Sequence, residues 1–198
     1  MRDLVFALSL VLACLAIPAG AADRSAAEAH FFSLNTGYFR AELADARAAG
    51  KKALLVMFEQ EGCPGCLYMK KNILSRRDVQ EYYHSHFVNF SLDIFGSVAL
   101  RDFAGRVVTE KAYAQAARIK VTPTFVFYDL AGTEVVRVAG PVETPEEFIL
   151  LGQFVASGAY KTRSFAQYKR EQPAERRKKT SFSPLPLVPA HLAPSLPN

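Results

Sequence analysis

The stretch Cys63-Pro64-Gly65-Cys66 stands between a continuous apolar run, residues 53–58, and a helix-forming stretch, residues 67–74. A continuous apolar run predicts a strand that is covered on both faces, which favours an α/β layer fold. A CxxC pair at a strand-to-helix junction is the arrangement that thiol–disulfide chemistry needs, because the helix N-terminus favours a thiolate at the first cysteine. The second cysteine lies one turn into the helix and is within reach to close a disulfide.

A single CxxC is also half of a zinc site, and His84 and His86 are the residues that would complete a Cys2His2 set. We favour the redox interpretation, because a chain of this size can build a full α/β core without a metal. The sequence therefore predicts no metal and no cofactor other than a redox-active Cys63–Cys66 disulfide.

The N-terminus is typical of a secretory signal peptide. Residues 4–17 are almost entirely apolar but too short for a comfortable membrane span, and Pro18 interrupts them. The small residues 19–22 that follow offer a cleavage site after Ala21 or Ala22. We therefore expect residues 1–22 to be a signal peptide, and the protein to be periplasmic or secreted.

The cysteine count follows from this assignment. Of the three cysteines, Cys14 lies inside the predicted signal peptide, which leaves Cys63 and Cys66 in the mature chain. Two cysteines three residues apart cannot link distant elements, so the pair is predicted to serve chemistry. A lipoprotein anchored through Cys14 is an alternative that residues 11–13 disfavour, because they form a poor lipobox.

The positive charge is concentrated at the C-terminus. Residues 160–198 hold eight lysines and arginines against two glutamates, a net charge of +6, whereas the whole chain carries +5. From residue 171 onward the chain is proline-rich and basic, which predicts a disordered tail. The run 176–179 could contact anionic lipid or acidic partners, but we favour a solvated tail without such a role. The high pI therefore belongs to the tail and says little about the partner of the folded part, for which we expect no nucleic acid.

The remaining sequence predicts alternating helices and strands after a lead-in, residues 23–36. The first half contains a helix over 38–49, the strand 53–58, a helix after Cys66, a second helix from a Ser75–Asp78 capping signal to His86, and a strand over 87–93. Residues 94–108 are less regular and predict a functional loop or a small subelement.

The second half begins with a helix capped by Thr109, which runs to about residue 118. The sequence 121–124 then leads into a strand over 125–128, and a turn at 131–132 predicts an antiparallel hairpin with 135–138. Thr144, with Pro145 and Glu147 after it, predicts the start of the last helix.

This order of elements, with the CxxC pair and a later Thr122-Pro123, resembles the thioredoxin superfamily over roughly residues 31–170. Four segments look most like those of periplasmic thioredoxin-like proteins of the SoxW type: "VMFEQEGCPGC", "VNFSLDIFG", "TPTFVFYDLAG" and "FILLGQFVASGAYK". The resemblance implies a thioredoxin fold: a central mixed sheet of about four to five strands flanked by helices, within a domain over 37–170.

The resemblance also implies the roles of the site residues. Cys63 is expected to be the attacking thiolate and Cys66 the resolving thiol. Pro64 and Gly65 hold the active-site turn. Thr122-Pro123 is expected to face the cysteines through a cis peptide bond, so that the backbone of Thr122 can pair with a substrate.

Two positions depart from the superfamily pattern. Thioredoxins carry an acidic residue six positions before the first cysteine, where this chain has Met57, and a tryptophan directly before it, where this chain has Gly62. Glu59 and Glu61 are the nearest carboxylates, and Glu59 is the candidate proton relay. Proton handling and the partner-facing surface are therefore expected to differ from those of a general thioredoxin.

The predicted function is that of an extracytoplasmic thiol–disulfide oxidoreductase that reduces protein disulfides. The alternatives are a disulfide oxidase or isomerase, and a non-catalytic binding module on the same scaffold. The expected partners are protein disulfides and dithiols, with a membrane thiol carrier as electron donor. We expect a monomer.

Overall fold

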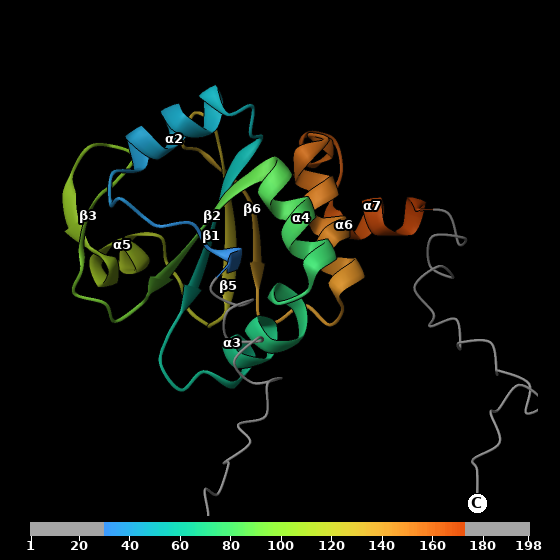
Figure 1. Cartoon of the computed structure of the whole chain (residues 1–198), viewed down its shortest axis with the longest axis horizontal. Helices are drawn as coiled ribbons and strands as arrows, with labels where there is room; N and C mark the ends of the chain where they lie inside the picture. The colour runs from blue at the N-terminus through green and yellow to red at the C-terminus, as the bar shows by residue number, and fades with distance from the viewer. Residues whose placement is uncertain (1–29, 173–198) are drawn as a thin grey trace, which may run out of the picture.

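A computed structural model describes residues 30–172 and contains one four-stranded mixed sheet with the order β2-β1-β5-β6 (Figure 1). The strands are β1 (Ala53–Glu59), β2 (Phe87–Asp93), β5 (Thr124–Asp129) and β6 (Glu134–Ala139). Strand β1 pairs parallel with β2 and antiparallel with β5, which pairs antiparallel with β6. The C-terminal ends of β1 and β2 and the start of β5 therefore lie at the same end of the sheet. The expected mixed sheet is confirmed.

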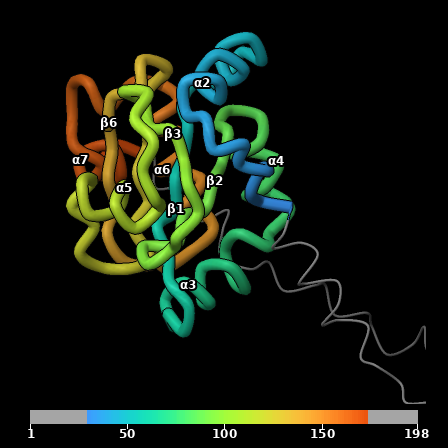
Figure 2. Tube along the Cα trace, turned by 90° about the vertical axis from the view of Figure 1, so that its left-hand side faces the viewer, coloured from blue at the N-terminus to red at the C-terminus, as the bar shows by residue number. Residues whose placement is uncertain are grey.

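Helices cover both faces of this sheet. They are α2 (Phe39–Ala48), α3 (Pro64–Tyr68), α4 (Arg77–His86), α5 (Glu110–Ala116), α6 (Pro145–Ala156) and α7 (Phe165–Glu171). Helices α4 and α6, together with Cys66 of α3, contribute to the core on one face of the sheet. Helices α2 and α5 contribute to the core on the other face. In both views α2 and α3 lie at opposite ends of the sheet (Figures 1 and 2). The end with α3 carries the CxxC pair.

The apolar side chains of β1 are buried on both faces of the sheet. Leu55 and Met57 belong to the core under α4 and α6, and Leu54 and Val56 to the core under α2 and α5. All four side chains are fully buried. The interpretation of this run as a central, doubly covered strand is confirmed.

The helix after the CxxC pair differs from the expectation. It is α-helical only to Tyr68 and continues as a π-helix from Met69 to Leu74. The predicted capping role of Ser75 is wrong: Ser75 ends the π-helix, and its hydroxyl donates to the Lys71 carbonyl. Helix α4 instead has Arg76 at its N-cap, without a side-chain cap. By contrast, the caps at Thr109 and Thr144 are confirmed.

Strand β2 contains a buried polar residue that the alternating pattern did not predict. Asn89 is fully buried, and its amide donates to the Phe31 carbonyl, which also contacts the His84 ring at 3.1 Å. The Ser33 amide donates to the Asn89 carbonyl, and the ring of Phe31 is itself fully buried. The segment around Phe31, expected only as a lead-in, therefore packs against the edge strand.

Residues 94–109 form a subelement of their own. It is a two-stranded hairpin of β3 (Ala99–Arg101) and β4 (Val107–Thr109), joined to the start of α2 by a bridge between Tyr38 and Arg101. The hairpin lies beside α5 (Figure 2). The prediction of a small subelement here is confirmed.

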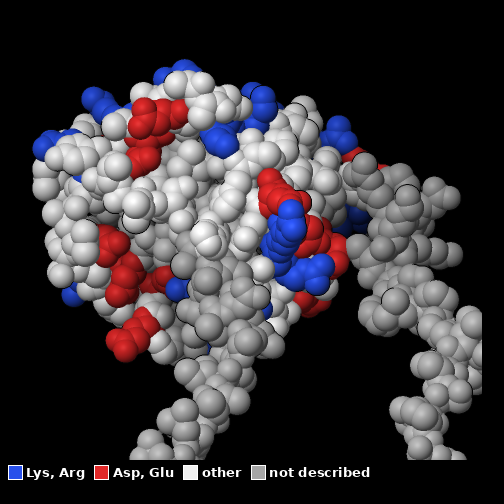
Figure 3. Space-filling model, in the orientation of Figure 1, with Lys and Arg blue, Asp and Glu red and all other residues white. Residues whose placement is uncertain are grey.

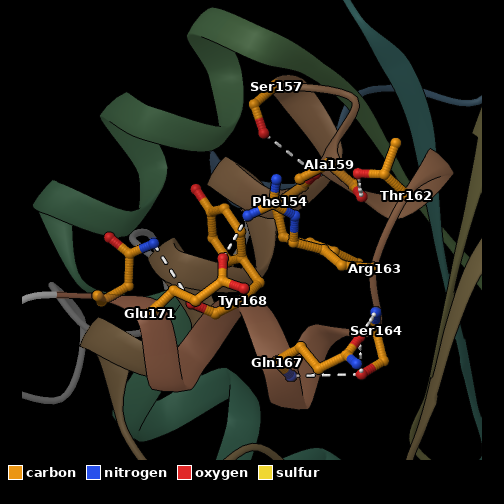
Figure 4. A network of polar contacts seen from close by, with 10 residues as sticks. Phe154, Ser157, Ala159, Thr162, Arg163, Ser164, Gln167, Tyr168 and Glu171 are labelled. Carbon is orange, nitrogen blue, oxygen red and sulfur yellow. Dashed lines mark hydrogen bonds and ion pairs between the residues drawn. The ribbon is translucent and has the colours of Figure 1, made fainter.

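The C-terminal described segment, a short 3-10 helix (Ala159–Lys161) and α7, was not predicted. Ser164 and Gln167 form a capping box, Arg163 pairs with Glu171, and the ring of Phe154 in α6 contacts Tyr168 (Figure 4). The capping box and the ion pair stabilise α7 and its start, and the ring contact joins α7 to α6. The predicted signal peptide, Cys14, and the tail from residue 173 with its basic run 176–179 lie outside the described residues.

Within residues 30–172, no helix combines the length and the apolar character that crossing a membrane requires.

Candidate active site

Cys63 and Cys66 are joined by a disulfide at the start of α3. Cys63 is the N-cap residue, and its sulfur accepts the backbone N–H of Cys66 at 3.1 Å. The hydroxyl of Thr122 lies 3.3 Å from the same sulfur and donates to it. A Cys63 thiolate in this position would accept hydrogen bonds from both groups. It would also lie at the helix N-terminus, whose partial positive charge stabilises the anion.

Both cysteines are nearly buried, and Cys63 is the more accessible, with 5% of its surface exposed against 2% for Cys66. The positions of the two cysteines explain this difference in exposure, because Cys63 precedes the helix whereas Cys66 lies one turn inside it. Pro64 occupies the first turn, where its missing N–H leaves no helical hydrogen bond unmade. The arrangement is consistent with Cys63 as the attacking residue.

The Thr122–Pro123 peptide bond is cis, as the resemblance implied. The turn and this loop are in close contact, because a Cβ atom on Gly65 would lie 3.0 Å from Pro123 Cδ and 3.7 Å from Pro141 Cδ. Gly65 therefore lets the two loops approach each other. The predicted residues Cys63, Gly65, Thr122 and Pro123 are brought together.

Gly65→Ala is expected to slow disulfide exchange about tenfold, because the new methyl group displaces the Pro123 loop by a few tenths of an ångström. The measurement is the rate of substrate disulfide reduction, with the melting temperature as control for a general loss of stability. An unchanged rate in a folded variant would show that the fit between these loops does not matter.

A pocket of about 360 Å³ opens beside the disulfide, lined by both cysteines and by Glu59, Glu61, Lys70 and Asp93, among others. At the end of β1, the Glu59 carboxylate forms an ion pair with Lys70 at 2.6 Å and accepts a hydrogen bond from Ser91. Its side chain is only 17% exposed. A partly buried carboxylate, fixed by two partners, therefore shares with both cysteines a pocket that is large enough to hold water.

The two departures from the superfamily pattern have structural counterparts. Met57 is fully buried in the same core cluster as Cys63 and Cys66, so the surface behind the disulfide is apolar. Gly62 adopts φ = +70°, a backbone conformation in which a larger side chain would be strained. A tryptophan at position 62 would not suit this loop.

Several contacting residues were missed by sequence reasoning. Tyr68 donates its hydroxyl to the Glu143 carbonyl at 2.6 Å, and the Met69 sulfur accepts the Val142 N–H at 3.3 Å. These bonds hold the loop after β6 against the helix that carries Cys66. Only Lys70, one helical turn after Cys66, could have been found from spacing, because residues i and i+4 share a helix face.

The histidines considered for zinc are engaged elsewhere. His84 contacts the Phe31 carbonyl, and His86 stacks on Tyr82 and contacts the Tyr82 carbonyl. Among the described residues, no three or more histidines, cysteines, aspartates or glutamates are grouped so that they could hold a metal ion.

A further acidic residue, Glu110, lies beside Asp93 of the pocket lining. Glu110, the first residue of α5, has a raised pKa because it is partly buried and because Asp93 is near. Gly96 makes this approach possible, since a Cβ there would lie 1.9 Å from the Glu110 carboxylate. The raised pKa favours the neutral form of Glu110, so the negative charge on this side of the disulfide comes from Glu59, Glu61 and Asp93, which outnumber the one lysine of the pocket lining, Lys70.

Comparison with known proteins gives the same fold. The family model described as a thioredoxin-like domain matches residues 39–156. A thioredoxin-fold protein from Helicobacter pylori is 20% identical, with a TM-score of 0.60 over 82% of this chain and 99% of that chain. No curated protein matches the chain.

Two further solved structures match with lower TM-scores. A thioredoxin from Thermus thermophilus is 29% identical over 60% of this chain and 85% of its own, with a TM-score of 0.46. A putative disulphide-isomerase from Bacteroides thetaiotaomicron is 21% identical over 67% and 96%, with a TM-score of 0.47. The family match over more than half of the chain, together with the sheet order and the CxxC disulfide, shows that this chain belongs to the thioredoxin-like domain family.

Proposed function

We propose that the protein is an extracytoplasmic thiol–disulfide oxidoreductase that reduces disulfides in other proteins. The observation that carries the proposal is the Cys63–Cys66 disulfide at a helix start, with Thr122 against the Cys63 sulfur. This placement stabilises one thiolate and keeps the second sulfur in reach, which is what dithiol exchange needs.

The reaction proceeds in two exchanges. The Cys63 thiolate attacks one sulfur of the partner disulfide, so that a mixed disulfide forms and a partner thiolate leaves. Cys66 then loses its proton and attacks the Cys63 sulfur, which closes the Cys63–Cys66 disulfide and releases the second partner thiolate. Two electrons and two protons pass to the partner, and a membrane thiol carrier returns the site to the dithiol form.

The location and the direction rest on the sequence. Residues 1–22 have the features of a signal peptide, and Cys63 and Cys66 are the cysteines that remain after its removal. The resemblance to SoxW-type periplasmic proteins supports reduction over oxidation, and a role either in sulfur-compound oxidation or in keeping periplasmic cysteines reduced.

The direction is tested by the reduction potential of the Cys63–Cys66 pair. We expect a value near that of reducing thioredoxins, about −270 mV, because the protein is proposed to donate electrons. Equilibration with glutathione or dithiothreitol buffers, followed by thiol alkylation, measures it. A value near about −120 mV would identify an oxidant and contradict the proposed direction.

We further propose Glu59 as the group that accepts the Cys66 proton, through water in the pocket they share. Glu59→Gln is then expected to slow the second exchange about ten- to a hundredfold, because the amide keeps the shape but not the base. The first exchange should change much less. Rapid-quench kinetics separate the two steps.

Glu81→Gln is a matched control for this variant, since Glu81 is an exposed residue of α4 with its own ion pair to Arg77. It should leave both exchanges unchanged. If Glu59→Gln slowed neither exchange, or slowed both equally, Glu59 would not be the proton acceptor.

A further inference from the structure

The surface around the disulfide differs in chemistry on its two flanks. The sheet order places the end of β2, with Asp93, on one side of β1 and the start of β5, with Thr122 before it, on the other. Cys63 follows β1 and so lies between these flanks. A polypeptide that presents its disulfide to Cys63 must contact one or both of them.

The β2 flank is negatively charged. Glu59, Glu61 and Asp93 line the pocket together with Lys70, and Glu110 lies beside Asp93. Lys70 pairs with Glu59, whereas none of the ion pairs found within residues 30–172 includes Glu61, Asp93 or Glu110. Three carboxylates therefore have no cationic partner among the described residues.

This local charge is opposite in sign to that of the surrounding domain. Residues 30–172 contain 18 lysines and arginines against 15 aspartates and glutamates, a net charge of +3. Acidic side chains nevertheless gather at the lower left of the space-filling view, at the height of the β1 and β2 ends in the same orientation (Figures 1 and 3). The negative charge at the pocket is thus a local feature.

The opposite flank offers an exposed apolar side chain. Val121 directly precedes the Thr122 that contacts the Cys63 sulfur on this flank, whereas Leu67, which directly follows Cys66, lines the pocket itself. Each of the two side chains is 50% exposed, which is high for large aliphatic residues next to a nearly buried disulfide. Apolar contact is therefore available beside the sulfur.

We propose that the physiological partner is a polypeptide that carries a lysine or arginine roughly two or three residues from its reactive cysteine, placed against Glu61 and Asp93. An apolar side chain of the same polypeptide lies against Val121. The proposal rests on the proposed function and names its substrate class. A basic side chain would supply the missing cation at the pocket, speed the encounter by electrostatic attraction, and set the orientation of the partner chain.

The test uses short peptides with one cysteine activated as a 2-thiopyridyl disulfide, so that released pyridine-2-thione reports the attack by Cys63. Peptides that differ only in lysine, glutamine or glutamate near the cysteine are compared. We expect the lysine peptide to react about tenfold faster than the glutamate peptide at low ionic strength, and less than about twofold faster at 1 M salt.

Variants assign the effect to the pocket. Glu61→Gln with Asp93→Asn should reduce the lysine preference to about twofold or less, because the amides keep the shape and remove both charges. Asn at position 93 can still accept the Phe95 N–H that Asp93 accepts. Glu81→Gln, outside the pocket, should keep the full preference. Equal rates for all peptides, or a preference that survives the double variant, would overturn the proposal.

The apolar flank is tested with a leucine or glycine beside the peptide cysteine. The leucine peptide should react several times faster with the wild-type protein, and Val121→Ser should lower that advantage. An advantage that is absent, or that Val121→Ser leaves unchanged, would contradict the apolar part.

A neutral reference separates this proposal from the proposed function. The 2-thiopyridyl disulfide of N-acetylcysteinamide carries no charged neighbour, so it reports dithiol reactivity alone. If it reacts no faster with the wild-type protein than with Cys63→Ser, the oxidoreductase function itself fails. Fast reaction with this reference, together with equal rates for all charged peptides, rejects only the substrate class.

Discussion

Cys63→Ser is expected to lower the catalysed rate of protein-disulfide reduction by about 10⁴-fold or more, because a hydroxyl in this place cannot attack a disulfide. Serine keeps the N-cap position, since its oxygen can accept the Cys66 N–H that the Cys63 sulfur accepts. The fold should therefore survive. The measurement is steady-state reduction of a protein disulfide with a thiol regenerating system.

Cys66→Ser is the informative comparison for this variant. It keeps the Cys63 nucleophile, so it should react once with substrate and then stop in a mixed disulfide. Substantial turnover by Cys63→Ser, with Cys66 acting alone, would contradict the assignment of Cys63 as the attacking residue.

Phe148→Ala is expected to lower the free energy of unfolding by about 3–5 kcal/mol. The Phe148 ring is fully buried, stacks on Tyr83 with ring centroids 4.4 Å apart, and meets Phe125 edge-on at 5.1 Å. Its removal leaves a cavity between α6, α4 and the sheet, which neighbouring rings cannot fill without moving. Urea denaturation measures the loss.

Phe95→Ala is the matched control for Phe148→Ala, because 65% of the Phe95 surface is exposed. The same change there should stay within about 0.5 kcal/mol of the wild type. A similar loss at both positions would mean that Phe148 does not hold α6 to the sheet.

The sheet and its covering helices could be predicted because their signals are local. The apolar run of β1, the turn at Gly132 and the threonine caps at Thr109 and Thr144 each act through neighbouring residues. The π-helix over Met69–Leu74 could not be predicted, since it depends on how this segment packs against the core. Burial of Asn89 depends likewise on Phe31, a distant residue.

The candidate site shows the same division. Cys63 and Cys66 were identifiable from type and spacing, and Pro123 from the resemblance to the thioredoxin superfamily. The partners of Glu59 were not, because Lys70 and Ser91 reach it from different elements and only the folded sheet places β2 beside β1. Asp93 and Glu110 are adjacent for the same kind of reason: the loop that contains Gly96 turns back over α5.

The central claim is that Cys63 attacks a partner disulfide and Cys66 resolves the product. The most direct test is to mix reduced Cys66→Ala protein with a disulfide-bonded protein substrate and to analyse the products by non-reducing electrophoresis and mass spectrometry. We predict a stable mixed disulfide through Cys63 that dithiothreitol reverses. The absence of any adduct from folded protein with a free Cys63 thiol would contradict the account.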